Sequence, residues 1–432
     1  MQASRFNIVT RVEGTDDHII VNLLSGHADM ISKSEAGALL SSSGHDKRFI
    51  EKGYLVDPVE EQLLFQMKYI DFLETRDQEE VQVFFVPTYH CNFDCTYCYQ
   101  SCYTAEEQEL SPHVISSFFQ FTDQHLSGKQ HYVTLFGGEP LLPGNSYHES
   151  INHFISLCGQ SDTDLAVVTN GYHLDKYLEG FHKCRIREIQ ITLDGTREIH
   201  DARRPVKGGK PSFDVIVGNL ERCLDLGFHV NLRVVIDRQN IHNLKDLARF
   251  AIDRGWTEHP LFKTQLGRNY ELHHCQSKGQ QLYSRIELYK DLYHLIREQP
   301  DISQFYKPAF SITKFLFDNG HLPQPLFDAC PGCKSEWALD YTGTVYPCTA
   351  TVGKKGEELG VFYPEIRLEN HKVGAWKNRD ITTIEACQTC SVQLACGGGC
   401  GSLAKNTNGH LLTPDCRPVK ERIGLGSAFY FS

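Results

Sequence analysis

The sequence lacks features that define several large classes of protein. No apolar run in its 432 residues approaches the roughly 18 to 20 residues needed to cross a membrane. The polar start, MQASRFNIVTRVEGTDD, has neither the basic nor the apolar region of an export signal. Lys and Arg number 43 against 54 Asp and Glu, a net charge of −11, which disfavours nucleic acid as the main ligand. We therefore expect a cytoplasmic protein that binds neither membrane nor nucleic acid.

Cysteine, by contrast, is abundant. The chain has sixteen, and a protein without an export signal occupies a reducing compartment where structural disulfides are disfavoured. Metal or redox chemistry is therefore the favoured explanation. Four cysteines lie close together between Cys91 and Cys102, and eight more lie between Cys330 and Cys416, so two groups flank a cysteine-poor middle.

Six short apolar strands alternate with helix-length segments in the middle of the chain. The strands are VQVFFVP, HYVTLFGG, DLAVVTNG, REIQITLDG, HVNLRVVID and PLFKTQLG. This order predicts an α/β fold with a parallel sheet, either an open doubly wound sheet or a partial barrel, and functional residues at the carboxyl ends of the strands. We expect a small α+β module at 1–78, the sheet and its helices at 79–300, a linker at 301–327, and a cysteine-rich domain at 328–432.

The first cysteine group directly follows the first of these strands. In TYHCNFDCTYCYQ the thiols of Cys91, Cys95 and Cys98 are spaced C-x3-C-x2-C. Three thiolates in one loop can hold a four-iron cluster and leave one iron open to an outside ligand. The alternative is a zinc site completed by His90 or Cys102.

These residues resemble the radical S-adenosylmethionine (radical SAM) family, whose C-x3-C-x2-C loop binds a 4Fe-4S cluster. The resemblance continues at the ends of the next three strands, although each motif alone is also an ordinary turn or helix-cap signal. It implies a partial (β/α)6 barrel and reductive cleavage of SAM to a 5′-deoxyadenosyl radical. The implied SAM-binding residues are Tyr97 beside adenine, Gly137, Gly138, Glu139 and Pro140 toward the amino group, and Thr169, Asn170, Thr192, Asp194 and Arg204 toward the ribose and carboxylate.

The second cysteine group supplies eight thiols, enough for two complete tetrads. Its C-x9-G-x4-C and C-x2-C-x5-C-x3-C runs and final cysteine resemble the SPASM domain, which holds two auxiliary 4Fe-4S clusters in many peptide-modifying radical SAM enzymes. Two zinc ribbons are the alternative. The resemblance implies an interleaved ligation, in which one cluster is held by Cys330, Cys333, Cys348 and Cys400 and the other by Cys387, Cys390, Cys396 and Cys416. Three clusters would leave five cysteines, most of them expected to be buried: Cys102, Cys158, Cys184, Cys223 and Cys275.

The resemblance leads to a functional hypothesis: a peptide maturase that abstracts hydrogen from a residue of a ribosomally made precursor peptide and forms a thioether or carbon-carbon crosslink. Its implied partners are that peptide and an electron donor such as flavodoxin or ferredoxin. Thr349 after Cys348, and Phe136 before the GGEP motif, differ from sulfatase-maturing members. Oxidation or epimerisation of one residue is the alternative reaction, and a noncatalytic metal-binding or electron-transfer scaffold is the alternative class.

Residues 1–78 loosely resemble leader-peptide recognition domains, in which the exposed edge of a sheet binds the leader as an added strand. A simple cap on the barrel is the other interpretation.

Overall fold

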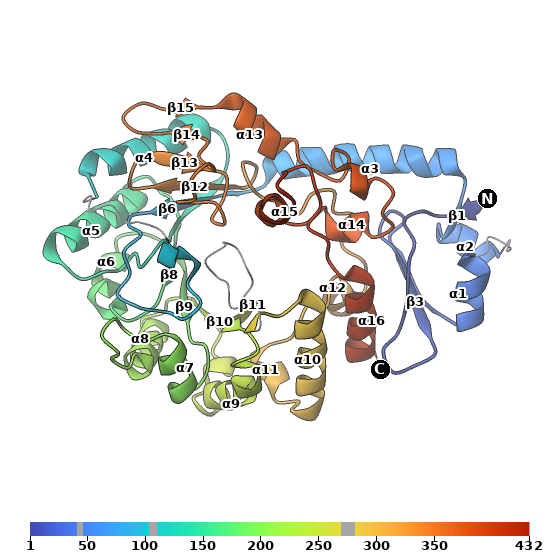
Figure 1. The fold of residues 1–432 in the computed structure, drawn as a ribbon, viewed down its shortest axis with the longest axis horizontal. Coiled ribbons are helices and arrows are strands. Elements are labelled where there is room, and N and C mark those ends of the chain that lie inside the picture. The colour runs from blue at the N-terminus through green and yellow to red at the C-terminus, as the bar shows by residue number, and fades with distance from the viewer. Residues whose placement is uncertain (41–45, 103–109, 269–280, 432) are drawn as a thin grey trace.

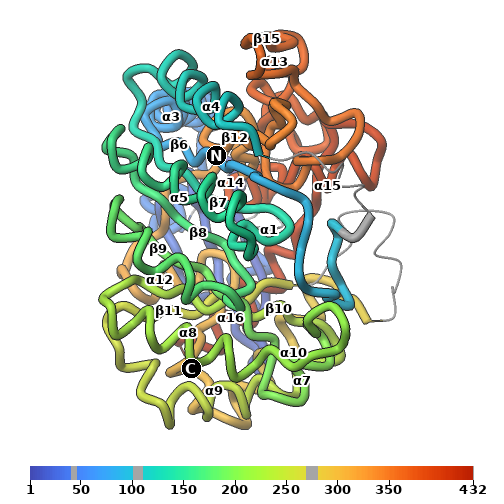
Figure 2. Tube along the Cα trace, turned by 90° about the vertical axis from the view of Figure 1, so that its left-hand side faces the viewer, coloured from blue at the N-terminus to red at the C-terminus, as the bar shows by residue number. Residues whose placement is uncertain are grey.

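The computed structural model of the protein describes residues 1–40, 46–102, 110–268 and 281–431. A curved array of strands lined outside by helices forms one side of the molecule, and the N-terminal unit forms the other (Figure 1). In the turned view, β15 and α13 lie at the top of the molecule and α9 at the bottom (Figure 2). None of the helices in these described ranges is long and apolar enough to cross a membrane.

Six parallel strands form the centre of the fold and pair in chain order. They are β6 (Val81–Val86), β7 (His131–Leu135), β8 (Leu165–Thr169), β9 (Ile186–Thr192), β10 (Val230–Ile236) and β11 (Phe262–Arg268). Because β11 ends the sheet on one side, the barrel is partial. The prediction of six β-then-α units in a parallel sheet is confirmed, and the partial barrel is the correct one of the two architectures.

Amphipathic helices cover the outside of these strands. The helix α4 (Pro112–His125) begins at Ser111, whose side chain accepts a hydrogen bond from the backbone of His113. Its buried Phe118 packs on Phe85 of β6, with the ring centroids 4.8 Å apart. The other barrel helices are α5 (Asn145–Gln160), α6 (Leu178–Phe181), α7 (Arg197–Arg203), α8 (Phe213–Asp225), α9 (Leu244–Asp253), α10 (Arg285–Glu298) and α11 (Ile302–Phe305).

The C-terminal domain extends the same sheet. Its first strand, β12 (Glu336–Asp340), pairs in parallel with β6, and the antiparallel strands β13 (Thr344–Tyr346), β14 (Gly360–Val361) and β15 (Arg367–Leu368) follow. Gly343 has φ +88° in the tight turn between β12 and β13, as the sequence predicts. The helices of this domain are α13 (Asn370–Lys377), α14 (Gln393–Cys396), α15 (Gly401–Asn408) and α16 (Val419–Tyr430).

The N-terminal unit is an α+β structure with a three-stranded antiparallel sheet in the order β2 (Ile8–Arg11), β3 (His18–Asn22) and β4 (His27–Ile31). Its other elements are β1 (Gln2–Ala3), α1 (Lys33–Leu40), α2 (Lys47–Glu51), β5 (Leu55–Val56) and the long helix α3 (Pro58–Gln78). As Figure 1 shows, α3 runs across the molecule from this unit to β6.

The N-terminal unit shares its core with the end of the chain. Phe6 and Phe65 pack in one buried cluster with Phe327 and Ile423, and the C-terminal helix α16 lies against β2. A Cβ atom on Gly424 of α16 would come within 2.4 Å of the Arg11 carbonyl oxygen, so the two backbones touch there. Residues 301–327, expected as a linker, contain α11 and α12 (Thr313–Asn319) and contribute to this core. The N-terminal unit is therefore continuous with the rest of the fold.

Candidate active site

The first cysteine loop follows β6 and is fixed by backbone hydrogen bonds to the chain after α7. The backbone nitrogen of Thr96 donates to the Arg203 carbonyl at 3.0 Å, and that of Lys207 donates to the Asn92 carbonyl at 2.8 Å. Such bonds leave the loop little freedom to move. The loop therefore presents its thiols from a defined position.

The three thiols of this loop influence one another electrostatically. Burial, and the neighbouring Cys95 and Cys98, raise the pKa of the Cys91 thiol to about 12. Burial also raises the pKa of Cys95 to about 11, although the nearby Arg204 guanidinium opposes that shift. The Cys91 and Cys95 thiols are thus protonated near neutral pH in the iron-free protein, and metal binding would displace their protons.

The GGEP segment after β7 packs directly against this loop. A Cβ atom on Gly137 would lie 2.6 Å from the Thr88 carbonyl oxygen, and one on Gly138 would lie 2.2 Å from that of His90. The backbone nitrogen of Glu139 donates to the same His90 oxygen at 2.9 Å. Only glycine allows this close approach, which brings the end of β7 against the cysteine loop.

The Glu139 side chain joins the ends of β7 and β8. Its carboxylate accepts hydrogen bonds from the Thr169 hydroxyl at 2.6 Å and the Asn170 backbone nitrogen at 2.7 Å. The Asn170 amide donates in turn to Asn92 of the cysteine loop at 2.8 Å. Burial raises the pKa of the Glu139 carboxyl, although these donors oppose the shift. The TNG and GGE residues thus form one bonded unit beneath the cysteines.

The residues after β9 form a second unit. The Arg204 guanidinium is buried and donates to the Tyr97 hydroxyl at 2.6 Å, which ties it to the cysteine loop. The Asp194 carboxylate instead accepts from the Val235 backbone nitrogen at 2.9 Å and pairs with Arg203 at 3.4 Å. Asp194 therefore holds strands and arginines in place from inside the protein.

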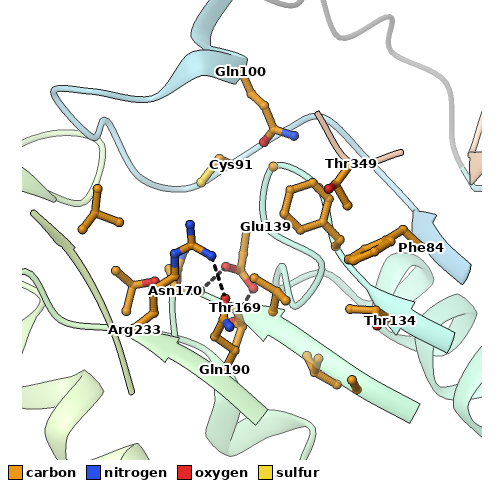
Figure 3. A pocket seen from close by; sticks show the side chains of 18 of the residues that line it. Phe84, Cys91, Gln100, Thr134, Glu139, Thr169, Asn170, Gln190, Arg233 and Thr349 are labelled. Carbon is orange, nitrogen blue, oxygen red and sulfur yellow. Dashed lines mark hydrogen bonds between the residues drawn. The ribbon is translucent and has the colours of Figure 1, made fainter. Parts of the chain in front are cut away.

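These units surround one cavity of about 580 Å³ inside the partial barrel (Figure 3). The structure brings eleven of the thirteen predicted residues of this region onto its wall and leaves two, Pro140 and Asp194, behind it. The wall includes Cys91, Cys95, Cys98, Tyr97, Gly137, Gly138, Glu139, Thr169, Asn170, Thr192 and Arg204.

Several wall residues were missed in the sequence, among them Gln190 of β9 and Arg233 of β10. Their signal is an alternation of polar residues within strands that are otherwise apolar, seen at Glu188, Gln190 and Thr192. Side chains two apart point to the same face of a strand, so such positions line the inside of a barrel. Thr349 also lies on the wall and donates from its hydroxyl to Glu336 at 2.9 Å.

The eight tail cysteines form two groups in space, and the members of the two groups are interleaved along the sequence. Burial and the neighbouring Cys330 and Cys400 raise the pKa of the Cys348 thiol. Cys333 is likewise beside Cys330. Cys400 therefore lies with the cysteines before β12 and after β13, although it follows Cys396 by only four residues.

The remaining four tail cysteines form the other group. Burial, and the neighbouring Cys396, Cys390 and Cys416, raise the pKa of the Cys387 thiol to about 11. Asp415, which precedes Cys416, contacts the first group: its carboxylate accepts from the Cys400 backbone nitrogen at 3.1 Å and pairs with Arg285 at 2.7 Å. The resemblance to SPASM domains implies the same two groups as ligand sets, and that ligation stays a prediction.

The donor sets fit iron-sulfur clusters. Soft thiolates in one set of three and two sets of four suit 4Fe-4S cores, the set of three leaving an open iron. Within the described ranges, however, no group of three or more His, Cys, Asp or Glu side chains stands where it could hold a metal ion. Cys158 of α5 and Cys223 of α8 are buried, as expected, and Cys184 is partly buried. Cys275 and the side chain of Cys102 lie outside the described part of the chain.

Comparison with known proteins gives the family of this site. A sequence profile of the radical SAM superfamily matches residues 85–251. The chain is 24% identical over 336 residues to a serine-type anaerobic sulfatase-maturating enzyme of Bacteroides thetaiotaomicron, covering 72% of this chain and 80% of that protein. It is also 24% identical over 327 residues to the mycofactocin maturase MftC of Mycolicibacterium smegmatis, covering 72% and 76%.

Solved structures show that the likeness in fold covers nearly the whole chain. Streptococcus suis SuiB bound to S-adenosylmethionine matches with a TM-score of 0.57 at 15% identity, over 97% of this chain and 99% of that one. Native anSMEcpe with bound AdoMet matches with a TM-score of 0.60 at 16% identity, over 81% and 97%. The expected fold class, a partial barrel followed by a cysteine-rich C-terminal domain, is confirmed. Residues 85–251 are therefore a radical SAM domain.

Proposed function

We propose that the protein is a cytoplasmic maturase that uses three 4Fe-4S clusters and SAM to form a thioether or carbon-carbon crosslink in a ribosomally made precursor peptide. The observation that carries the proposal is the single cavity on which the three-cysteine loop, the GGE unit and the strand-end polar residues converge. Bound there, the first cluster and SAM supply a 5′-deoxyadenosyl radical. A reductant such as flavodoxin or ferredoxin supplies the electrons.

The chain's own residues orient the cofactor and enclose the reaction. Cys91, Cys95 and Cys98 would hold the cluster, and the GGE backbone packed against their loop would offer carbonyls to the SAM amino group. Buried Arg204 supplies a fixed positive charge next to Cys95, where it compensates the negative charge of thiolates and of the SAM carboxylate. The barrel wall excludes water from the radical.

A peptide substrate is supported by the proteins that the chain resembles. The relatives include a sulfatase-maturating enzyme and a mycofactocin maturase, and SuiB has been solved bound to the precursor peptide SuiA, with a TM-score of 0.53 to this chain. At the position after Cys348 the cavity carries Thr349, whose hydroxyl is held by Glu336. Because Thr349 and Phe136 both differ from the sulfatase-maturing members, we favour a peptide crosslink over sulfatase maturation.

The N-terminal sheet offers an edge for the leader of that peptide. The strand β4 pairs only with β3 in the described structure, whereas β2, at the other edge, is covered by α16. An open strand edge binds an extended peptide through main-chain hydrogen bonds. We therefore assign leader capture to β4 (His27–Ile31).

The test starts with anaerobic reconstitution of the full chain, which should bind about twelve irons, as expected for three four-iron clusters. Replacing Cys91, Cys95 and Cys98 together by Ala should remove about four irons and abolish 5′-deoxyadenosine formation. The Cys158→Ala variant is the matched control and should retain both. Incubation with the short peptide encoded beside the gene should yield a product lighter by two hydrogen atoms. An unchanged mass with inverted stereochemistry would instead show epimerisation, and SAM cleavage by the triple variant would refute the assignment of the cluster.

A further inference from the structure

The cavity wall carries an excess of positive charge although the protein as a whole is acidic. Five basic residues line it in the part of the chain that the structure describes, against two carboxylates, Glu139 and Glu188. The five are Arg187, Arg204, Arg233, Lys263 and Arg268. A concave wall of one sign concentrates ligands of the opposite sign.

Most of this charge has a partner within the protein. Arg187 pairs with Glu80 at 2.7 Å, and Lys263 pairs with Glu188 at 2.5 Å. Arg204 donates to Tyr97, and Arg268 donates to the Tyr283 carbonyl. The Glu139 carboxylate is already bonded by Thr169 and Asn170. These four basic residues therefore stabilise the cavity wall, Arg204 on the side of the cysteine loop.

Arg233 differs from them. It lies on the inner face of β10, and in Figure 3 its guanidinium points into the cavity with a hydrogen bond to Gln190. That bond, from Nη1 to the Gln190 amide oxygen, is 3.4 Å long. Within the described residues Arg233 pairs with no carboxylate. A partly buried guanidinium has five N–H donors in a planar fork, and one long bond to a neutral amide leaves most of them available.

The neighbouring strand β11 leaves room for the Arg233 side chain. Gly267 of β11 lies beside it, and a Cβ atom there would stand 3.1 Å from Arg233 Nη2 and 3.3 Å from Nε. The backbone of Gly267 does not have the positive φ that would itself require glycine. Room for the guanidinium is therefore the reason that the structure gives for glycine at this position.

We propose that Arg233 binds a carboxylate of the peptide substrate and so selects peptides with an acidic group next to the residue that is modified. The inference rests on the proposed peptide-modifying function and names the substrate class for that site. Arg204, tied to the cysteine loop, serves the cofactor, and Arg233, on the strand β10, serves the substrate. The carboxylate comes from an Asp or Glu side chain or from the peptide's C-terminus, and the planar fork suits both.

The test is capture of random decapeptides from bead libraries by the cluster-loaded, SAM-bound full chain. One library is attached through its C-terminus, which leaves only side-chain carboxylates, and the other through its N-terminus. Wild-type protein should enrich Asp or Glu at one position of the first library, or a free C-terminus in the second. Arg233→Gln should abolish the preference, and Arg233→Glu should enrich Lys or Arg in its place. The selected peptide, resynthesised, should bind Arg233→Gln about tenfold more weakly or worse.

A second variant separates the contact from the folding of the barrel. Gly267→Ala keeps the charge but displaces the guanidinium, and it should reduce the acidic preference as well. Arg238→Gln is the matched control, because Arg238 pairs with Glu287 at 2.9 Å outside the cavity, and it should leave the preference intact. The SAM dissociation constant of Arg233→Gln should equal that of wild type.

Three results would overturn the inference. Equal capture by wild type and Arg233→Gln without an acidic preference would refute carboxylate recognition while leaving the peptide function standing. A SAM dissociation constant raised about tenfold in Arg233→Gln, with the peptide preference unchanged, would assign the residue to the cofactor. Failure of the wild-type protein both to capture any library peptide and to modify the precursor peptide would refute the peptide function and this inference together.

Discussion

Arg379 is the side chain whose loss should do most damage to the C-terminal domain. It is fully buried, and its guanidinium donates four hydrogen bonds to backbone carbonyls, those of Gly398, Gly399, Leu411 and Thr413, at 2.9 to 3.0 Å. These carbonyls belong to the segments that lead to Cys400 and Cys416. The Arg379 guanidinium therefore links the two loops that carry Cys400 and Cys416.

The cost of Arg379→Met follows from these contacts. A hydrogen bond to a charged group contributes about 1.5–3 kcal/mol, but four bonds to one guanidinium do not add independently. Breaking a buried charged network typically costs about 3–5 kcal/mol, and we expect a loss in this range. Domains are stable by only about 5–15 kcal/mol, so the variant should also bind less iron at the two auxiliary sites.

Chemical denaturation followed by tryptophan fluorescence measures this loss, because two of the three tryptophans, Trp337 and Trp376, are buried in the same domain. Arg367→Met is the control in the same domain: Arg367 pairs with Glu365 at 3.8 Å and its side chain is 72% exposed, so we expect a loss of at most about 1 kcal/mol. A destabilisation by Arg379→Met no larger than that of the control would refute the reasoning.

Three further predictions concern the clusters, the thiols and the sheet edge. Cys400→Ala should perturb the spectrum of the cluster held by Cys330, whereas Cys416→Ala should perturb the other, and the reverse pattern would contradict the interleaving. The free energy of unfolding of the iron-free protein should fall as the pH rises from about 9 toward about 12, because unfolded thiols lose their protons near 9 while folded Cys91 keeps its proton to about 12. In the triple Ala variant of the first loop, the free energy of unfolding should fall less steeply with pH. An equal slope in the two proteins would contradict the thiol assignment. Backbone amides of His27–Ile31 should gain protection from hydrogen exchange when the precursor peptide is added but not when a leaderless version is added, and protection confined to other segments would move the leader site away from β4.

The sequence determined the parts of the site that depend on local spacing. Three cysteines within eight residues must lie in one loop, and the GGE, TNG and DG segments each follow an apolar strand. Since the carboxyl ends of parallel strands meet at one edge of a sheet, convergence of these motifs follows from their order along the chain. The grouping of Cys400 with Cys330 came from the resemblance to SPASM domains, because spacing alone favours pairing it with Cys396.

Only the tertiary structure showed what the remaining polar residues do. Arg203 and Arg204 are adjacent in sequence, yet Arg203 pairs with Asp237 at 2.8 Å inside the protein whereas Arg204 faces the cavity. Adjacent side chains diverge by about 100° on a helix and its end, and their partners come from distant segments. In the same way, Asp194 follows the fourth strand as a cavity residue would, but Arg203 and the Val235 backbone hold it behind the wall.

The placement of the two ends of the chain was also decided by packing. The sequence predicted an α+β module at 1–78 and a cysteine-rich domain at the other end, but nothing local shows that α16 lies against β2 or that Phe65 meets Phe327. Such contacts depend on the burial of apolar surface between segments far apart in the chain, and local sequence patterns do not specify which segments meet. The same holds for Arg233. Alternation within β10 places it on the inner face, whereas the tertiary structure shows which side chains of the described residues reach it, and no carboxylate is among them.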